Sequence, residues 1–132
     1  MSNGSRSINE EGFKISYYYA IDGDDIGKKL EEYALKNDIR AIVSLSNRVK
    51  AALLKIQNHI HSKGGETIFC EGDSLLACSD ELIEVSMQQL SFNENVSFSA
   101  GVGSTSALAL LALKKAKGLG KSRIEIFMER PE

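Results

Sequence analysis

The sequence predicts an α+β domain in which an antiparallel sheet carries helices on one face, with the element order βααββαβαβ. Apolar and polar residues alternate over residues 13–21 and again over 95–103, and this period of two is typical of strands. From Ile42 to Ile60 apolar residues recur at spacings of three and four, which predicts one long helix. Helices and hairpins are segregated along the chain, which favours an α+β arrangement over a parallel sheet.

The composition is that of one ordinary globular domain. The chain has 132 residues, of which 42% are hydrophobic and 26% charged, enough for a core without metal or disulfide staples. Residues 1–12 are polar and without a period, so we expect a flexible leader before a single domain over 13–132. The net charge of −2 gives no electrostatic basis for binding duplex nucleic acid.

The cysteines and the apolar runs bear on location. The two cysteines are Cys70 and Cys78, and the polar N-terminal segment lacks the apolar core that secretion needs. No run approaches the roughly 18 apolar residues of a membrane span. We therefore expect a cytoplasmic protein with reduced thiols.

The first predicted strand places an acidic residue on an open face of the sheet. One face of this strand is apolar, with Phe13, Ile15, Tyr17, Tyr19 and Ile21. Tyr18 and Asp22 belong to the opposite face, and Asp22 lies at the C-terminal end of the strand. Tyr18 is a candidate for stacking on a nucleobase.

The later elements follow from their breaking and capping residues. We expect a helix over 25–36, a long helix from Asp38 to Gly64, and a hairpin of two short strands over 66–70 and 75–78. The remaining predicted elements are a helix from Ser79 to Leu90, a strand over 95–103, a helix from Ser104 to Lys117 and a last strand over 123–128. The outer face of the strand over 95–103 has almost no side-chain bulk (Ser97, Ser99, Gly101 and Gly103), which favours the close approach of a ligand.

Three carboxylates follow the first strand within four positions. Asp22, Asp24 and Asp25 repel one another, and a fold gains nothing from that repulsion alone. A divalent cation reverses the balance, because carboxylate oxygens suit Mg²⁺ or Mn²⁺. A solvated turn is the competing interpretation of this loop.

A second acidic turn lies in the middle of the chain, at Glu71-Gly-Asp-Ser74. If the first strand neighbours this hairpin, Asp22 and Asp73 can share metal ions that hold a triphosphate and stabilise a leaving pyrophosphate. The Gly23 carbonyl is a further candidate ligand. Gly72 lets the backbone of the turn approach the metal or the phosphates. Taken alone, this sequence is also a common hairpin turn.

A basic cluster near the C-terminus supplies the complementary charge. Five of the ten residues from Lys114 to Arg123 are basic and surround two glycines. Lys117 and Lys121 flank a turn from which both can reach the terminal phosphates of a nucleotide. Lysines at a helix C-terminus also complement the helix dipole, which is the simpler interpretation.

These motifs together resemble the palm domains of nucleotide cyclases. The tail from Ala112 to Ile124 is similar to the ending of diguanylate cyclase (GGDEF) domains, and Val96-Ser-Phe-Ser-Ala-Gly-Val102 is similar to one of their strands. That resemblance implies triphosphate contacts from Lys117 and Lys121. It also implies that Asp22, the Gly23 carbonyl and Asp73 hold the metals.

The chain looks most like the minimal CRISPR polymerases, single palm domains related to the polymerase subunit of type III CRISPR effectors and to GTP cyclohydrolase III. The opening Ile21-Asp-Gly-Asp-Asp-Ile-Gly27 and the short length carry this resemblance, which spans residues 13–128. It implies a ferredoxin-like palm that makes a cyclic dinucleotide, cyclic di-AMP, from ATP with Mg²⁺ or Mn²⁺. It further implies a role in anti-phage defence and a membrane effector that responds to the product. Because the palm has one triphosphate site, a second copy must present the second substrate, and we expect a homodimer with facing sites.

Two departures from the GGDEF pattern leave alternatives open. Glu71 and Ser74 replace a glycine and an acid of that turn, so a second metal would draw on Asp24 or Asp25. Ser74 then remains only as a nucleotide contact. The inhibitory R-x-x-D motif of many GGDEF domains is also missing, which disfavours cyclic di-GMP as the product. A catalytically degenerate nucleotide-binding module and a GTP cyclohydrolase III-like hydrolase are the competing functions.

Overall fold

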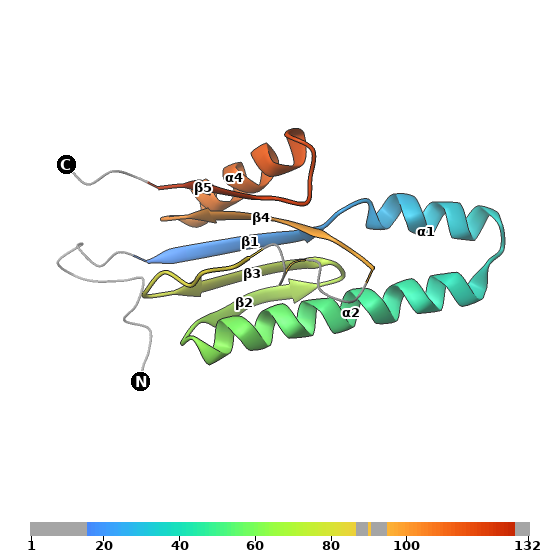
Figure 1. Cartoon of the computed structure of the whole chain (residues 1–132), viewed down its shortest axis with the longest axis horizontal. Coiled ribbons are helices and arrows are strands. Elements are labelled where there is room, and N and C mark those ends of the chain that lie inside the picture. Colours follow the sequence, from blue (N-terminus) through green and yellow to red (C-terminus); the bar gives the residue numbers. More distant parts are fainter. Residues whose placement is uncertain (1–15, 87–89, 91–94, 129–132) are drawn as a thin grey trace.

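The computed structural model describes residues 16–86, 90 and 95–128, and its described part is built on one five-stranded sheet (Figure 1). The strands lie in the order β2-β3-β1-β4-β5. Their bounds are β1 Tyr17–Gly23, β2 Glu66–Glu71, β3 Ser74–Ser79, β4 Phe98–Gly103 and β5 Ile124–Phe127. The described helices are α1 Ile26–Leu35, α2 Ile39–Ser62 and α4 Ser106–Gly118. The predicted α+β class is confirmed.

The central strand is β1, which is antiparallel to β3 on one side and to β4 on the other. At its C-terminal end Asp22 lies opposite Ser74 of β3 and Ser99 of β4. This register brings the end of β1 beside the turn of the β2–β3 hairpin.

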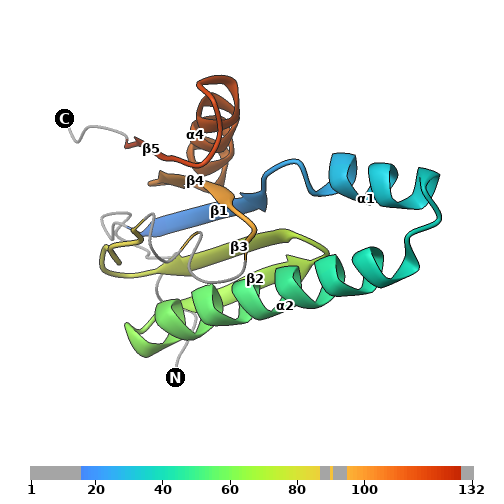
Figure 2. The same ribbon diagram turned by 45° about the vertical axis from the view of Figure 1, so that its right-hand side comes forward.

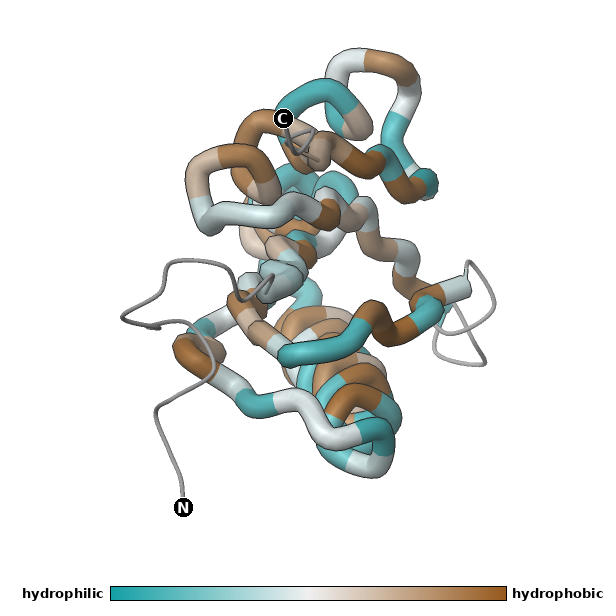
Figure 3. Tube along the Cα trace, turned by 90° about the vertical axis from the view of Figure 1, so that its left-hand side faces the viewer, coloured by the Kyte–Doolittle hydropathy of each residue, from teal (hydrophilic) through white to brown (hydrophobic). Residues whose placement is uncertain are grey.

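The long helix α2 covers one face of the sheet. Asp38 caps it by accepting a hydrogen bond from Ala41 N at 3.1 Å, as predicted. Its buried face packs with alternate residues of the strands, among them Tyr19 and Ile21 of β1 and Ala100 of β4. Hydrophobic and hydrophilic segments alternate along the trace in Figure 3. Helix α1 and the N-terminal part of α2 project beyond the end of the sheet (Figures 1 and 2).

Helix α4 lies on the opposite face, so the expectation that helices cover one face only is wrong. Ala100 and Val102 of β4 face the α2 core, whereas Gly101 and Gly103 face α4. A Cβ on Gly101 would lie only 2.2 Å from the carbonyl oxygen of Ala109 in α4. Gly101 and Gly103 of β4 therefore pack against the backbone of α4. The prediction that this bare face is left for a ligand is wrong for these two residues.

The sheet is mixed rather than wholly antiparallel, which is a second correction. Strand β5 pairs with β4 in parallel, from Ala100 opposite Ile124 to Gly103 opposite Phe127. A parallel neighbour requires a crossover connection, and α4 supplies it. This crossover brings the basic end of α4 back to the C-terminal end of β1.

The helix predicted from Ser79 to Leu90 is not formed over residues 80–86, which are irregular. Side chains take the backbone groups that a helix would use: Ile83 N donates to Tyr19 Oη at 2.8 Å, and Ser79 Oγ donates to the Glu81 carbonyl at 2.6 Å. Residues 87–89 of that prediction, the leader 1–12 and the predicted strand start at 13–15 lie outside the described residues. Within the described helices, none has the length and apolarity that a membrane crossing requires.

Candidate active site

The two acidic turns meet at the end of β1, which is the geometry that the sequence analysis required. Gly23 N donates to the Asp73 carbonyl at 3.0 Å. A Cβ on Gly23 would lie 2.9 Å from Asp73 Oδ2 and 2.6 Å from Ile26 Cγ1. Only glycine therefore lets the hairpin turn approach β1 this closely.

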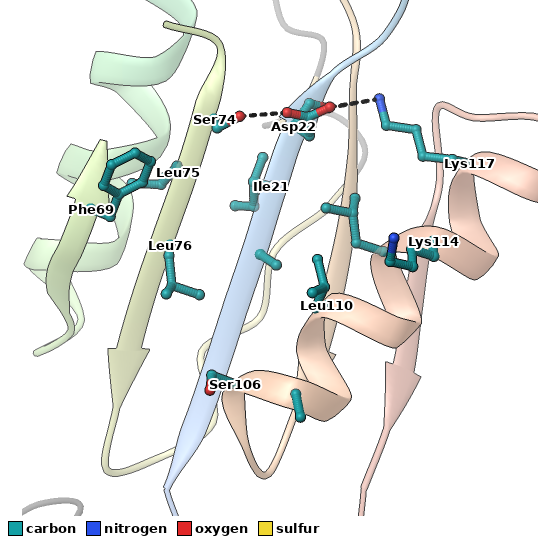
Figure 4. Close-up of a pocket in the computed structure, with 13 residues that line it drawn as sticks. Ile21, Asp22, Phe69, Ser74, Leu75, Leu76, Ser106, Leu110, Lys114 and Lys117 are labelled. Atoms are coloured by element: carbon teal, nitrogen blue, oxygen red, sulfur yellow. Dashed lines mark hydrogen bonds and ion pairs between the residues drawn. The ribbon is translucent and has the colours of Figure 1, made fainter. Parts of the chain in front are cut away.

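Asp22 and Asp73 form the acidic pair of the site. Ser74 Oγ donates to Asp22 Oδ1 at 2.6 Å and so fixes the carboxylate (Figure 4). Burial raises the pKa of Asp73 above its usual value, and the neighbouring charge of Asp22 raises it further. Two carboxylates that repel one another beside the Gly23 carbonyl are the kind of oxygen donor set that a hard divalent cation stabilises.

The donor set fits a cation whose coordination a substrate completes. Among the described residues, no group of three or more His, Cys, Asp or Glu side chains is placed to hold a metal ion. Asp22, Asp73 and the Gly23 carbonyl thus supply at most part of a shell, which is usual for Mg²⁺ bound together with substrate phosphates.

Asp24 is buried, and both oxygens of its carboxylate accept hydrogen bonds. It is 4% exposed and accepts from Ser97 Oγ at 2.8 Å, Ser99 Oγ at 2.7 Å and Ser122 N at 3.0 Å. Burial acts to raise its pKa, but the hydrogen bonds from Ser99, Lys117 and Ser97 outweigh burial and hold the pKa below the usual value. Asp24 therefore ties the loop after β1 to β4 and to the segment before β5.

The three serines that hold Asp24 were not assigned this role from the sequence. Ser97 and Ser99 were expected on a bare face left for ligand, and Ser122 was not singled out. The sequence signal for Ser97 and Ser99 is a pair of small hydroxyl residues at alternate positions of a strand. This signal becomes informative only once Ser99 is known to lie opposite Asp22. Ser122 binds Asp24 through its backbone amide, which leaves no signal in the sequence.

Asp25 and Lys121 form an exposed ion pair beside the acidic pair. Lys121 Nζ donates to Asp25 Oδ1, and this hydrogen bond lowers the pKa of Asp25 and raises the pKa of Lys121. Both residues have positive φ, 59° for Asp25 and 67° for Lys121. The loop after β1 and the segment before β5 are thus joined at the surface by this ion pair, as well as in the interior through Asp24.

Lys117, in the last turn of α4, reaches the same carbonyls and carboxylates. Its Nζ donates to the Gly23 carbonyl at 2.7 Å and to Asp24 Oδ1 at 2.9 Å. It also lies 3.3 Å from Asp22 Oδ2, the contact drawn in Figure 4. Lys117 and Lys121 thus both lie at the acidic loop, and their role as triphosphate contacts stays a prediction.

Two clefts open on either side of the acidic pair. A cavity of about 670 Å³ lies between α4 and the strands, with Asp22, Ser74 and Lys117 at one end and apolar side chains such as Phe69 and Leu110 along it (Figure 4). A second cavity of about 450 Å³ lies between α1, α2 and the hairpin turn. It is lined by Ile26, Gly27, Leu30, Ile42, Leu45, Ser46, Val49, Lys50, Gly72 and Asp73.

The residues predicted to bind nucleotide are thus divided among these surfaces. Ser74 and Lys117 line the first cavity, Gly72 lines the second, and Lys121 lies at the loop surface with Asp25. Tyr18 is not among the residues that line either cavity and lies four positions from Asp22 along β1. Its stacking role therefore remains a prediction.

Comparison with known proteins identifies a family and a fold. The model of the minimal CRISPR polymerase domain matches residues 18–127. Among solved structures, the active GGEEF domain of a diguanylate cyclase from Vibrio cholerae is similar with a TM-score of 0.66 and 14% identity, covering 92% of this chain and 88% of that one. At that identity the likeness shows the fold alone.

One curated relative has an unrelated description. The chain is 29% identical over 73 residues to the dimethylsulfoniopropionate lyase DddP of Roseobacter denitrificans. The matched segment is 55% of this chain but only 15% of the lyase. So small a share of the lyase supports no inference about the activity of this chain.

Proposed function

The chain belongs to the minimal CRISPR polymerase family, and from this premise we propose that it is a metal-dependent nucleotidyltransferase that joins nucleoside triphosphates and releases pyrophosphate. The observation that carries the proposal is the meeting of Asp22, Asp73 and Lys117 at one point of a palm-like sheet. Carboxylates for a divalent cation and an ammonium for phosphate are the two charges that phosphoryl transfer requires.

Each residue has a distinct task in this proposal. Asp22, Asp73 and the Gly23 carbonyl hold Mg²⁺ or Mn²⁺, and Ser74 fixes the orientation of Asp22 through its 2.6 Å hydrogen bond. When bound, the cation neutralises charge on the phosphates and makes the attacking hydroxyl more acidic. Asp24, with its oxygens already filled, positions Lys117 rather than serving as a metal ligand.

Lys117 and Lys121 stabilise the triphosphate and then the departing pyrophosphate. A ribose hydroxyl of one nucleotide loses its proton to water and forms the new bond to the α-phosphorus of the other. The bond between the α-phosphorus and the bridging oxygen breaks, and that oxygen leaves with the pyrophosphate. The two cavities beside the acidic pair offer apolar walls for the nucleosides. Positioning and charge stabilisation, rather than a covalent intermediate, carry this chemistry.

The family supports a more specific product. We take the product to be a cyclic dinucleotide, cyclic di-AMP made from two molecules of ATP, that signals in anti-phage defence to a membrane effector. Two phosphodiester bonds close such a ring, whereas each chain brings one Asp22–Asp73 pair. A homodimer in which two sites face each other accounts for both bonds, and the enzyme would act in the cytoplasm.

The proposal is tested by pyrophosphate release from each of the four nucleoside triphosphates with Mn²⁺. Asp22→Asn and Asp73→Asn keep the side-chain size but remove the charge, and each is expected to lower turnover by about 10³-fold or more. The control is Asp25→Asn, whose carboxylate pairs with Lys121 at the surface and is expected to cost less than about tenfold. An Asp73→Asn protein with wild-type turnover would refute the assigned site.

A nucleotide-binding module without turnover is the second candidate function. It is favoured by Ser74, which leaves the hairpin turn with Asp73 as the carboxylate that faces β1. This candidate predicts tight binding of a nucleotide with or without divalent metal and no pyrophosphate release. Calorimetry with ATP in the presence of a chelator separates it from the catalytic proposal.

A further inference from the structure

The ammonium of Lys117 occupies the groups that the proposed cation would use. Its Nζ lies 2.7 Å from the Gly23 carbonyl oxygen and 3.3 Å from Asp22 Oδ2. Both belong to the donor set assigned above to Mg²⁺ or Mn²⁺. An ammonium has three hydrogens to donate and one positive charge, so it satisfies the same oxygens that a metal ion would.

The position of Lys117 is set by Asp24 and not by chance contact at the surface. Asp24 Oδ1 accepts from Lys117 Nζ at 2.9 Å, while Ser97, Ser99 and the Ser122 amide hold the Asp24 carboxylate in place. Lys121 provides a contrast, because it pairs with the exposed Asp25. The two lysines that the sequence analysis grouped together therefore have different partners.

We propose that Lys117 is a built-in counter-cation that couples metal binding to nucleotide binding. It neutralises the Asp22 carboxylate and donates to the Gly23 carbonyl while the nucleotide is absent, and it moves to the phosphates when the metal–nucleotide complex arrives. The inference rests on the proposed function, since it assumes that Asp22 and Gly23 are metal ligands. It adds that Lys117 opposes the metal when no triphosphate is present.

The physical reason is that two cations cannot share one small set of acceptors. A metal ion that enters alone must displace the ammonium from Gly23 and Asp22 and then remain close to it, which costs hydrogen bonds and adds repulsion. A triphosphate removes both costs, because its oxygens accept the ammonium and also ligate the metal. The flexible stem of Lys117, whose side chain is 24% exposed, gives the ammonium room to change partners.

Coupling of this kind is reciprocal and measurable. We would titrate Mn²⁺ into the full chain and follow free Mn²⁺ by electron paramagnetic resonance, with and without the non-hydrolysable analogue α,β-methylene-ATP. Lys117→Met removes the ammonium and keeps the stem. It is expected to tighten Mn²⁺ binding in the absence of nucleotide by about tenfold, within the usual range of coupling energies, and to shrink the further gain from the analogue.

The matched control is Lys115→Met, which removes the same charge from the same turn of α4. Lys115 lies near Glu125 and the Phe127 ring, away from the acidic pair. Its Mn²⁺ affinity is expected to stay within about twofold of wild type. A Lys117→Met protein that binds Mn²⁺ no more tightly than Lys115→Met would overturn the proposal.

A second measurement needs no variant and so does not depend on folding of Lys117→Met. Acetylation of surface amines, read by mass spectrometry, reports how exposed each ammonium is. Saturating Mn²⁺ without nucleotide is expected to speed acetylation of Lys117 several-fold and to leave Lys115 unchanged. Unchanged acetylation of Lys117 under saturating Mn²⁺ contradicts the displacement.

Failure of the inference can be told from failure of the proposed function. If Asp22→Asn abolishes Mn²⁺ binding while Lys117→Met leaves it unaltered, the metal site stands and only the coupling is refuted. If Asp22→Asn binds Mn²⁺ as the wild type does, the assigned metal site itself is wrong, and the inference falls with it.

Discussion

Asp24 and Asp25 are adjacent in the sequence but have different environments. Asp24 is buried and held by Ser97, Ser99, Ser122 and Lys117, whereas the Asp25 side chain is 44% exposed and pairs with Lys121. The sequence offered both as substitutes for the acid that Ser74 replaces. Which of the two is buried depends on the close approach of β4 and the segment before β5, and that approach has no local signal.

The first prediction concerns the contributions of Asp24 and Asp25 to the stability of the fold. Asp24→Asn keeps the shape of the side chain but replaces one acceptor oxygen by a donor that faces existing donors. It is expected to lower the free energy of unfolding by about 3 kcal/mol, because a buried network then loses its charge and is left unsatisfied. Urea denaturation measures this change.

The control at the neighbouring position is Asp25→Asn, since asparagine tolerates the left-handed backbone of Asp25 as aspartate does. An exposed ion pair contributes at most about 1 kcal/mol, so this variant is expected to unfold close to wild type. Equal losses of stability in the two variants would refute the anchoring role of Asp24.

At the scale of elements, α4 determines the site because it carries Lys117 to the end of β1. Its approach is permitted by Gly101 and Gly103, which leave one face of β4 without side chains. The sequence showed this bare face but did not show whether a ligand or a helix covers it. Strand alternation predicts which residues share a face, while the partner of that face depends on the path of a distant segment.

The second prediction tests this packing. Gly101→Ala places a Cβ 2.2 Å from two backbone atoms of α4, so the helix must move away from the sheet. We expect a loss of about 3 kcal/mol in the free energy of unfolding, at the upper end of overpacking costs, together with weaker nucleotide binding. Gly27→Ala in α1 meets nothing within 4 Å and is expected to gain about 0.5–1 kcal/mol from helix propensity.

Urea denaturation of the two glycine variants provides the measurement. A Gly101→Ala protein as stable as wild type would show that α4 does not pack on β4 as described.

At the scale of the whole molecule, the sequence predicted the order of the helices and strands that the structure describes. It also predicted a helix where residues 80–86 are irregular, and it gave the contact between the two acidic turns only as a condition of the site. It did not predict that β5 pairs in parallel or that helices cover both faces. Short strands such as β5, with four residues, carry little information about their neighbours. The meeting of Asp22 with Asp73 stayed conditional, because no local signal in the sequence says that the hairpin lies beside β1.

The homodimer is the third prediction and belongs to this scale. A chain of 14.4 kDa with one acidic pair is expected to show twice that mass by light scattering when Mn²⁺ and α,β-methylene-ATP are present. Excess Asp22→Asn protein is expected to lower the turnover per wild-type chain, because mixed dimers lack one of the two sites. Full turnover by a species that remains monomeric would refute the facing arrangement.

The central claim is that this palm joins two nucleotides at the Asp22–Asp73 pair, and the most direct measurement is mass spectrometry of the product. The wild-type protein is incubated with ATP and Mn²⁺ beside Asp22→Asn and Asp73→Asn. We expect a cyclic dinucleotide and pyrophosphate from wild type and neither from the variants. Wild-type protein that binds Mn²⁺ and ATP but yields no cyclic product, or a variant that still yields it, would contradict the claim.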